Sequence, residues 1–250
     1  PLVIHAEDYN LAGKGQIHGG RVASRLGLAG LPGLAEEVIV SRDIMLAEST
    51  GARLHIAHIS TARSIELVRE AKERGGKVTC EVTPHHLILT EEACRGFNTN
   101  TKMKPPLRTE KDRQACLDAL KDGTIDCIAT DHAPHADFEK VREFDHAPFG
   151  IIGLETAFCA LYHHLVKPGH LSLARLAEAL TSAPAKILDL PPAELKTGHP
   201  ADLNIIDLEA STTFTAESML SKSKNTPWLD QTLSGRVVCT FLEGRVTWQE

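Results

Sequence analysis

Three side chains that commonly bind metal ions each follow a short apolar run in this sequence. His5 ends the run LVIH, His58 lies in LHIAHIST, and Asp131 directly follows CIAT. Imidazole nitrogen and carboxylate oxygen are suitable ligands for zinc and similar divalent ions. If the runs are parallel strands, their carboxyl ends converge on one ligand site. The sequence therefore predicts a divalent metal site formed by His5, His58 and Asp131.

Most of the other histidines have a simpler explanation. A single histidine near a strand end is more often hydrogen-bonded in the core or at the surface, so the repetition at three strand ends is what favours a metal site. His85 and His86 could line the same site, but adjacent residues point apart, so at most one would face it. We expect the other histidines without a motif to be exposed to solvent or hydrogen-bonded in the core. They are His163 and His164 in a helix, and His18, His55, His146, His170 and His199.

Two segments with proline or glycine could lie over this site. Residues 104–108 (KPPLR) place two prolines before a helix, and prolines hold a loop rigid. Residues 148–151 (PFGI) place Gly150 where a backbone can approach a ligand closely. Either segment could equally be an ordinary turn.

The first 190 residues alternate between short apolar runs and helical patterns, which is typical of βα units and a parallel sheet. Strands are predicted over 2–6, 54–59, 77–83 and 125–130. Helices are predicted over 34–49, 61–74, 109–122, 153–166 and 172–189, the last interrupted near Pro184. Capping residues support these helices, because Thr61 and Thr109-x-x-Asp112 precede two of them.

After about residue 190 the pattern becomes strand-like. Residues 198–208 and 235–248 predict strands, and Glu243-Gly244 predicts a hairpin turn inside the second segment. The chain is therefore expected to form an α/β domain over 1–190 and a small β-rich appendage over 191–250.

Composition excludes several classes of function. The chain has 250 residues, 42% of them hydrophobic, and a formal net charge of −6 without a Lys/Arg-rich run, which disfavours a nucleic-acid partner. No run approaches the length of a membrane helix, and no signal peptide is recognisable. The six cysteines are scattered without a CxxC pair, so we expect them to be reduced thiols. Together these features predict a cytoplasmic protein.

Eight segments resemble one known family, the type I dihydroorotases of the amidohydrolase superfamily. They occur in the family's order along essentially the whole chain, and TDHAPH together with EVTPHHL and PPLR is highly specific. The segments are VIHAED (3–8), IAHISTA (56–62), CEVTPHHL (80–87), KPPLRTEKDR (104–113), CIATDHAPH (127–135), PFGIIGLET (148–156), GHPADLNIID (198–207) and SKSKNTPW (221–228).

The resemblance implies the C-terminal half of a (β/α)8 TIM-like metal-dependent hydrolase barrel, comprising strands 5 to 8, with a small β-rich appendage. It also implies that further metal ligands, including a His-x-His pair, and a substrate-binding arginine would precede Pro1. An open half-barrel would expose two sheet edges, so we expect the chain alone to aggregate or to be completed by another polypeptide.

Several site residues are assigned by the resemblance. His5 and His58 correspond to ligands of one or two Zn²⁺ ions, and Asp131 corresponds to a ligand that also acts as general base. His135 corresponds to a residue that binds the substrate carboxylate, and the backbone at Phe149 and Gly150 to a substrate contact. Lys104 replaces the asparagine that usually precedes PPLR, and a lysine there could pair with a carboxylate.

The activity implied by the resemblance is the interconversion of L-dihydroorotate and N-carbamoyl-L-aspartate in pyrimidine biosynthesis. Type I dihydroorotases can associate with aspartate transcarbamoylase, so that partner and an oligomeric state are implied as well. Two alternatives stay open: another cyclic amidohydrolase, such as an allantoinase or a dihydropyrimidinase, and a non-catalytic scaffold subunit for aspartate transcarbamoylase. Retention of the three predicted ligands favours the enzyme over the scaffold.

Overall fold

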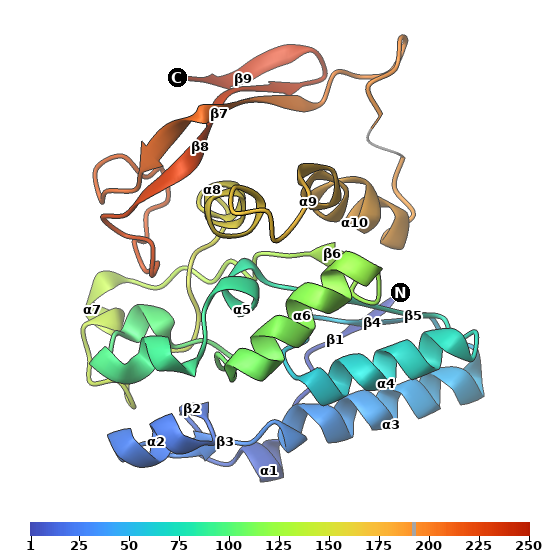
Figure 1. The fold of residues 1–250 in the computed structure, drawn as a ribbon, viewed down its shortest axis with the longest axis vertical. Helices are drawn as coiled ribbons and strands as arrows, with labels where there is room; N and C mark the ends of the chain where they lie inside the picture. Colours follow the sequence, from blue (N-terminus) through green and yellow to red (C-terminus); the bar gives the residue numbers. More distant parts are fainter. Residues whose placement is uncertain (192–193) are drawn as a thin grey trace.

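A four-stranded parallel sheet lies at the centre of the computed structural model, which describes residues 1–191 and 194–250 (Figure 1). Its strands are β1 (Leu2–Ile4), β4 (Leu54–Ile56), β5 (Val78–Val82) and β6 (Cys127–Ile128), in the spatial order β1-β4-β5-β6. Every neighbouring pair is parallel, so the predicted α/β sheet is confirmed. The strands are shorter than predicted because the backbone leaves the extended conformation near the residues that follow them; His58 and Asp131, for example, have positive φ.

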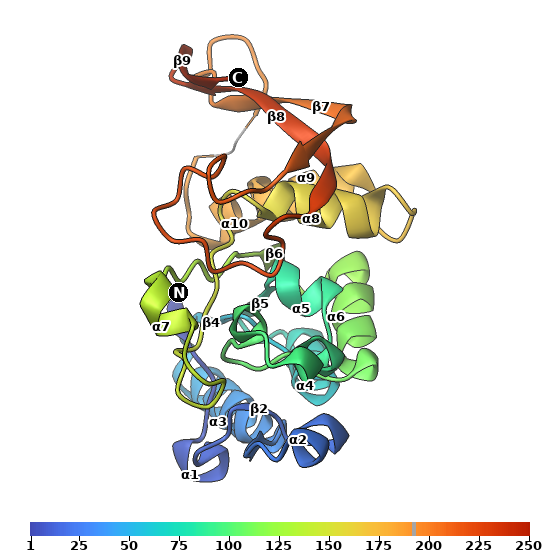
Figure 2. The same cartoon turned by 90° about the vertical axis from the view of Figure 1, so that its left-hand side faces the viewer.

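Three long helices pack beside this sheet: α3 (Leu34–Thr50), α4 (Ala62–Glu73) and α6 (Glu110–Asp122) (Figures 1 and 2). Their predicted positions are confirmed, and so are the caps. The Thr61 hydroxyl accepts a hydrogen bond from the Ser64 amide, and Thr109 forms a capping box with Asp112. These caps satisfy amide groups that have no partner within the helix.

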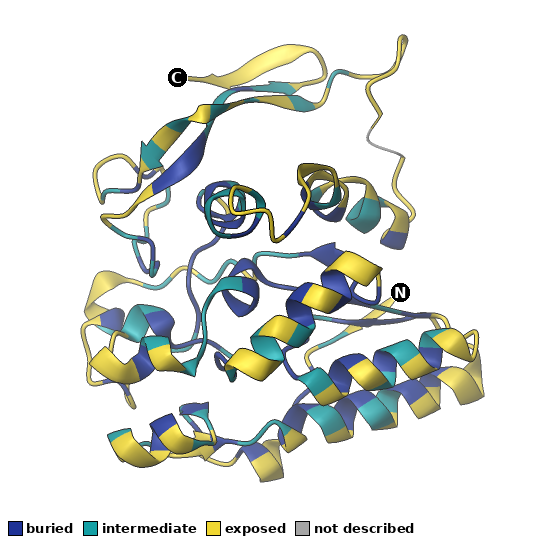
Figure 3. Ribbon diagram, viewed as in Figure 1, coloured by how far each residue is buried: buried dark blue, intermediate teal, exposed yellow. Residues whose placement is uncertain are grey.

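The main hydrophobic core lies between these helices and the sheet. Val78, Cys80 and Val82 of β5 are fully buried and belong to this core, whereas the alternating residues Thr79 and Glu81 are only partly buried (Figure 3). Because side chains alternate across a strand, the sheet presents apolar groups to the helices and polar groups to its other face. That polar face carries the candidate site.

A second, two-stranded parallel sheet was not predicted. It pairs β2 (Ile17–His18), which follows α1 (Tyr9–Ala12) along the chain, with β3 (Gly30–Leu31), which follows α2 (Arg21–Leu26). The two strands approach so closely that a Cβ on Gly30 would lie 2.5 Å from the Gly19 Cα atom. Two-residue strands carry no hydrophobic period, so the sequence pattern gave no indication of them.

Short elements fill the loops that follow β5 and β6. They are α5 (Pro84–Ile88), the 3₁₀ helices Glu91–Gly96 and Thr99–Thr101, and α7 (Asp137–Lys140). The helix predicted over 153–166 begins only at α8 (Ala157–Leu161) and continues as a π-helix over Tyr162–Val166. The helix predicted over 172–189 is divided into α9 (Leu173–Leu180) and α10 (Ser182–Ile187).

The predicted interruption near Pro184 is confirmed, and the break itself lies at Thr181. Thr181 has φ −130° and ψ −81°, which are not helical values. Pro184 lies in the first turn of α10, where a residue without an amide hydrogen is tolerated.

The C-terminal residues form a three-stranded antiparallel sheet of β7 (Leu203–Thr213), β8 (Thr232–Leu242) and β9 (Arg245–Gln249). The predicted hairpin is confirmed, since Glu243 and Gly244 both have positive φ between β8 and β9. The sheet lies beyond α8, α9 and α10 from the parallel sheet (Figure 2). Phe214, Trp228 and Leu233 form a buried cluster there with Cys159 and Ala160 of α8. The division of the chain into 1–190 and 191–250 stays a prediction, and residues 192–193 lie outside the described part.

The edge strand β1 is open to solvent, with Leu2 65% and Val3 55% exposed. All six cysteines are buried free thiols, as predicted. Among the residues that the structure describes, no helix is long and apolar enough to cross a membrane.

Candidate metal and substrate site

Two of the predicted metal ligands are in direct contact at the carboxyl ends of β1 and β4. Nδ1 of His5 lies 3.0 Å from Nε2 of His58, and the two rings meet edge to face. Asp131 follows β6, the fourth strand of the same parallel sheet, at the same carboxyl edge. The structure therefore brings the three predicted residues to one edge of the sheet, although their role as ligands stays a prediction.

The backbone at two of these residues adopts an uncommon conformation. His58 has a φ of 35° and Asp131 a φ of 49°. Residues other than glycine rarely adopt positive φ, and such strain is concentrated at functional sites, where the surrounding fold maintains it. Both side chains therefore leave their strands in directions that ordinary extended backbone would not give them.

The electrostatics of the site favour neutral imidazole. Burial lowers the pKa of His5, and a positive charge on His58 would lower it further. Asp131 is exposed as a residue, but partial desolvation of its carboxyl raises the pKa, although His58 and His5 act in the opposite direction. A neutral imidazole has a free lone pair, and this is the form that binds a metal ion.

The residues present fit a divalent metal ion. Tetrahedral zinc separates neighbouring nitrogen ligands by about 3.3 Å, given Zn–N distances of about 2.0–2.1 Å, and the two facing nitrogens of His5 and His58 lie 3.0 Å apart. In this contact at most one of the facing nitrogens carries a hydrogen when both rings are neutral. Imidazole nitrogen and carboxylate oxygen are donor types that zinc accepts, but among the described residues the ligand-type atoms that all lie within 4.8 Å of one another are those of His55, Glu81 and Cys127, not those of His5, His58 and Asp131.

A polar layer lies one step deeper on the same face of the sheet. Nδ1 of His55 lies 2.8 Å from the Thr79 hydroxyl, and its Nε2 lies 3.1 Å from the Glu81 carboxylate. The Cys127 sulfur completes a group with His55 and Glu81 whose ligand-type atoms lie within 4.8 Å of one another. Burial raises the pKa of Cys127 to about 12, so it stays a thiol. Both ring nitrogens of His55 thus have hydrogen-bond partners in the core, as predicted. We interpret this layer as structural support for the candidate site above it.

Lys104 is linked to the predicted metal ligand His5 through the Glu7 carboxylate, which the sequence motifs did not identify as part of the site. Its Nζ atom lies 2.7 Å from Oε1 of Glu7, and Oε2 of Glu7 lies 3.5 Å from Nε2 of His5. The Lys104 ammonium also lies 5.3 Å from the centre of the Phe149 ring. The position of Glu7 two residues after His5 in HAED was the available signal, because alternate residues of an extended segment share a side.

The other predicted substrate residues form a second group joined to the first through Phe149. Nε2 of His135 lies 2.8 Å from the Phe149 carbonyl oxygen. Gly150 has a φ of 118°, and a Cβ atom there would lie 2.6 Å from Cβ of Ala133. The Asn225 amide donates hydrogen bonds to the carbonyl oxygens of Ala133 and Gly150. Asn225, within the segment SKSKNTPW, was not selected as a site residue, yet it ties these two loops together.

Two buried lysines hold the segment that contains Phe149 and Gly150. Lys102 donates hydrogen bonds to the carbonyl oxygens of Phe144, Asp145 and Ala147, and Lys140 donates to those of Pro148 and Gly150. Burial lowers the pKa of each lysine to about 8. No motif in the sequence distinguished these lysines from solvated ones.

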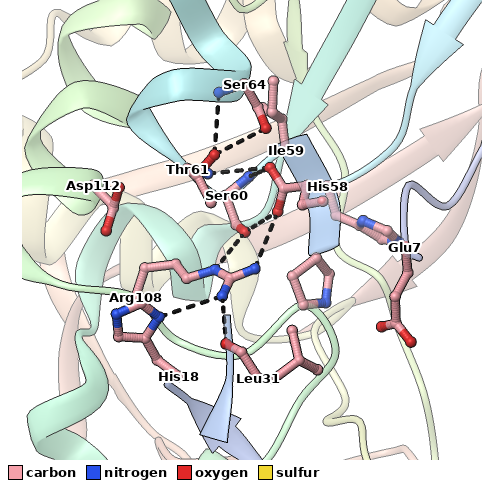
Figure 4. A network of polar contacts seen from close by, with 12 residues as sticks. Glu7, His18, Leu31, His58, Ile59, Ser60, Thr61, Ser64, Arg108 and Asp112 are labelled. Carbon is pink, nitrogen blue, oxygen red and sulfur yellow. Dashed lines mark hydrogen bonds and ion pairs between the residues drawn. The ribbon is translucent and has the colours of Figure 1, made fainter. Parts of the chain in front are cut away.

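A buried ion pair fixes the PPLR loop next to the site (Figure 4). The Arg108 guanidinium lies 3.4 Å from the Glu36 carboxylate and donates to the Ser60 hydroxyl at 3.0 Å and the Leu31 carbonyl at 3.1 Å. Burial acts to raise the pKa of Glu36, but Arg108 and Ser60 outweigh it and the net pKa is lowered. Since Ser60 follows His58 by two residues, this pair supports the loop that carries a predicted ligand.

His85 and His86 are both buried on the short helix α5 and differ in their surroundings. Nδ1 of His86 lies 2.8 Å from the Thr83 hydroxyl and its Nε2 lies 3.1 Å from the Pro105 carbonyl oxygen. Among the described residues, Nε2 of His85 is buried without a hydrogen-bond partner, and burial lowers the pKa of His85 well below its usual value, with smaller contributions from His86 and His58. The expectation that at most one of them faces the site remains a prediction.

Comparison with known proteins agrees with this architecture. A model of the amidohydrolase family matches residues 1–247, nearly the whole chain. The chain belongs to the amidohydrolase family. It is 51% identical over 250 residues to a protein named dihydroorotase from Endomicrobium trichonymphae, and 50% identical over 252 residues to one from Anaeromyxobacter dehalogenans. Both alignments cover 100% of this amidohydrolase chain, but only 59% and 58% of those relatives.

Solved structures of two hydantoinases share the fold. L-Hydantoinase (dihydropyrimidinase) from Arthrobacter aurescens superimposes with a TM-score of 0.88 at 29% identity, covering 99% of this chain and 56% of that one. D-Hydantoinase (dihydropyrimidinase) from Thermus sp. gives a TM-score of 0.87 at 26% identity. The predicted architecture, the C-terminal half of a metal-dependent hydrolase barrel with a small β-rich part, is confirmed.

Proposed function

We propose that the intact protein to which this chain belongs is a dihydroorotase. It would interconvert L-dihydroorotate and N-carbamoyl-L-aspartate by opening and closing a cyclic amide. The single observation that carries this proposal is the convergence of His5, His58 and Asp131 at one sheet edge, beside a second group that includes His135 and Lys104. The identity of about half of all residues to proteins named dihydroorotase supports it.

His5, His58 and Asp131 would hold Zn²⁺, one ion or two. A zinc ion lowers the pKa of a water molecule that it binds to about 7 and polarises a carbonyl group. Asp131 would accept the proton from the water molecule that attacks the ring carbonyl carbon. As the ring C–N bond breaks, Asp131 would give that proton to the leaving nitrogen.

His135, Lys104 and the backbone at Phe149 and Gly150 would bind the substrate. A carboxylate is recognised by cationic or hydrogen-bonding groups, and His135 and Lys104 provide both kinds on either side of Phe149. Binding there would hold the ring carbonyl against the metal site and exclude substrates without a carboxylate.

The deciding experiment is a substrate comparison with the intact zinc-loaded protein. We expect turnover of dihydroorotate and carbamoyl aspartate, and little turnover of dihydrouracil, hydantoin or allantoin. The structural similarity to hydantoinases favours a second candidate, a dihydropyrimidinase-like enzyme, and preference for dihydrouracil or hydantoin would replace our proposal with that one. Zinc binding without turnover of any of these compounds would favour the non-catalytic scaffold.

We also propose a cytoplasmic oligomer that can associate with aspartate transcarbamoylase. The similarity to proteins named dihydroorotase supports this proposal. Size-exclusion chromatography of the intact protein with and without aspartate transcarbamoylase from the same source would test it, because an elution shift is expected only if the two associate.

A further inference from the structure

The carboxylate of Glu7 is buried between two groups that serve different parts of the proposed site. Its side chain is 4% exposed, with the imidazole of His5 on one side and the ammonium of Lys104 on the other. A buried carboxylate is costly unless it is paired or hydrogen-bonded. No role in the proposed reaction uses Glu7, so its burial at this position calls for an explanation.

We propose that Glu7 is a positioning residue that links the metal site to the substrate-binding lysine. One carboxylate oxygen orients the imidazole of His5 toward the metal, and the other holds Lys104 beside Phe149. This inference rests on the proposed function, because it assumes that His5 binds zinc and that Lys104 binds the substrate carboxylate.

The orientation of His5 carries the first half of the inference. Its Nδ1 atom faces Nε2 of His58 at 3.0 Å, so Nε2 is the nitrogen left to face Glu7. Histidines that bind a metal through one nitrogen usually direct the other N–H at a carboxylate or carbonyl oxygen, which fixes the tautomer and the ring orientation. The His5–Glu7 distance of 3.5 Å is longer than an ordinary hydrogen bond, so the attraction in this structure is electrostatic.

The surroundings of Lys104 carry the second half. Its ammonium lies 2.7 Å from Glu7, 5.9 Å from the centre of the Tyr9 ring and 5.3 Å from that of Phe149. The Lys104 side chain is 28% exposed, so a substrate can still reach it. Glu7 therefore holds a flexible side chain in one place and balances its charge close to a site that must bind a dication.

The two charges predict opposite effects on zinc affinity. Removing the negative charge in Glu7→Gln weakens the orientation of His5 and leaves the Lys104 charge unbalanced near the metal. We expect zinc affinity to fall about 10- to 100-fold, the usual effect of losing such a carboxylate. Removing the positive charge in Lys104→Met leaves Glu7 unbalanced, so zinc affinity should stay the same or rise, while KM for dihydroorotate rises more than kcat falls.

The test is a competition titration in which the metal-free intact protein and a chromophoric chelator compete for Zn²⁺. Glu48→Gln is a matched control, because Glu48 forms an ion pair with Arg74 on the surface. Glu7→Asp is a second variant that keeps the charge but shortens the side chain, and it should lose less zinc affinity than Glu7→Gln. Circular dichroism checks that each variant is folded, and Glu7→Asp alone decides the question if Glu7→Gln does not fold.

Three outcomes would overturn the inference: zinc affinity of the Glu7 variants equal to that of Glu48→Gln, parallel losses of zinc affinity in Glu7→Gln and Lys104→Met, or no zinc binding by the unaltered protein. The titration involves no turnover, so its failure is separable from failure of the proposed function. If Glu7→Gln loses zinc affinity but the unaltered protein does not turn over dihydroorotate, the role of Glu7 in orienting His5 is retained. Dihydroorotate is then rejected as the substrate.

Discussion

Nδ1 of His5 and Nε2 of His58 lie 3.0 Å apart, although the residues are separated by 53 positions in the sequence. Strands β1 and β4 are hydrogen-bonded neighbours, with Ile4 opposite Ile56, and each histidine follows its strand by one or two residues. A parallel register therefore places the two imidazoles at the same sheet edge.

Replacement of Asp131 by Asn should remove nearly all turnover of the intact enzyme and leave the fold unchanged. An amide cannot accept the proton from the attacking water, and loss of a general base costs about 100- to 10,000-fold in rate. The measurement is kcat with dihydroorotate, together with an unfolding curve. Asp230→Asn is the control, because Asp230 is an exposed aspartate that also has a positive φ of 61°. Near-normal turnover in Asp131→Asn would reject the proposed role.

Replacement of Gly150 by Ala should raise KM. The new Cβ atom would lie 2.6 Å from Cβ of Ala133 and 3.3 Å from Nε2 of His135, so the Phe149 carbonyl would be displaced from His135. Gly169→Ala is the matched control, since Gly169 also has positive φ, 84°, but would bring a Cβ atom into open space. Both variants should lose some stability from backbone strain. Equal KM values for the two variants would show that the Gly150 backbone does not contact substrate.

Replacement of Arg108 by Met should destabilise the protein by about 3–5 kcal/mol at neutral pH, because it leaves the buried Glu36 carboxylate without its partner. The pH dependence gives a sharper test. In the unaltered protein the pKa of Glu36 is lowered, so its contribution is present above the ordinary pKa of about 4.5 and is lost as pH falls. Without Arg108, burial would raise that pKa, and the penalty would shrink as pH falls and the carboxyl becomes protonated.

Urea unfolding of metal-free protein at pH 7 and pH 4.5 would measure this difference. The unfolding free energies of the unaltered protein and Arg108→Met should therefore lie closer together at pH 4.5. The double variant Glu36→Gln with Arg108→Met is the control. It carries no charged carboxylate at residue 36, so its loss of unfolding free energy at neutral pH does not include the cost of an unpaired buried charge. A gap of the same size at both pH values would show that the loss comes from packing alone.

Replacement of Lys102 by Met should raise KM and lower stability while leaving zinc affinity unchanged. Three carbonyl oxygens in the segment 144–147 would lose their hydrogen-bond donor. Each one that stays buried without a partner should lower the free energy of unfolding by about 1–3 kcal/mol. Phe149 and Gly150 follow this segment directly, so their positions would become less defined. Lys14→Met, at an exposed lysine, is the control. A KM equal to that of Lys14→Met would show that this loop does not affect substrate binding.

Local features of the sequence were sufficient for the central sheet, its helices and the C-terminal hairpin. The cap at Thr61, the capping box at Thr109 and the turn at Glu243-Gly244 depend on residues within a few positions of one another. The meeting of His5 and His58 was also predictable, because parallel strands of one sheet end at the same edge. Helix ends were less predictable: the break at Thr181 carries no proline or glycine.

The tertiary structure alone decided which polar side chains pair beneath and beside that edge. Glu7 meets Lys104, Glu36 meets Arg108, and the paired residues lie 97 and 72 positions apart in the sequence. Such pairs have no period and no local signal, because their energy depends on how much water the assembled fold excludes and on which opposite charge it brings within a few ångströms. The sequence by itself determined that the predicted metal ligands follow the ends of their strands, and folding determined which charged side chains lie against them.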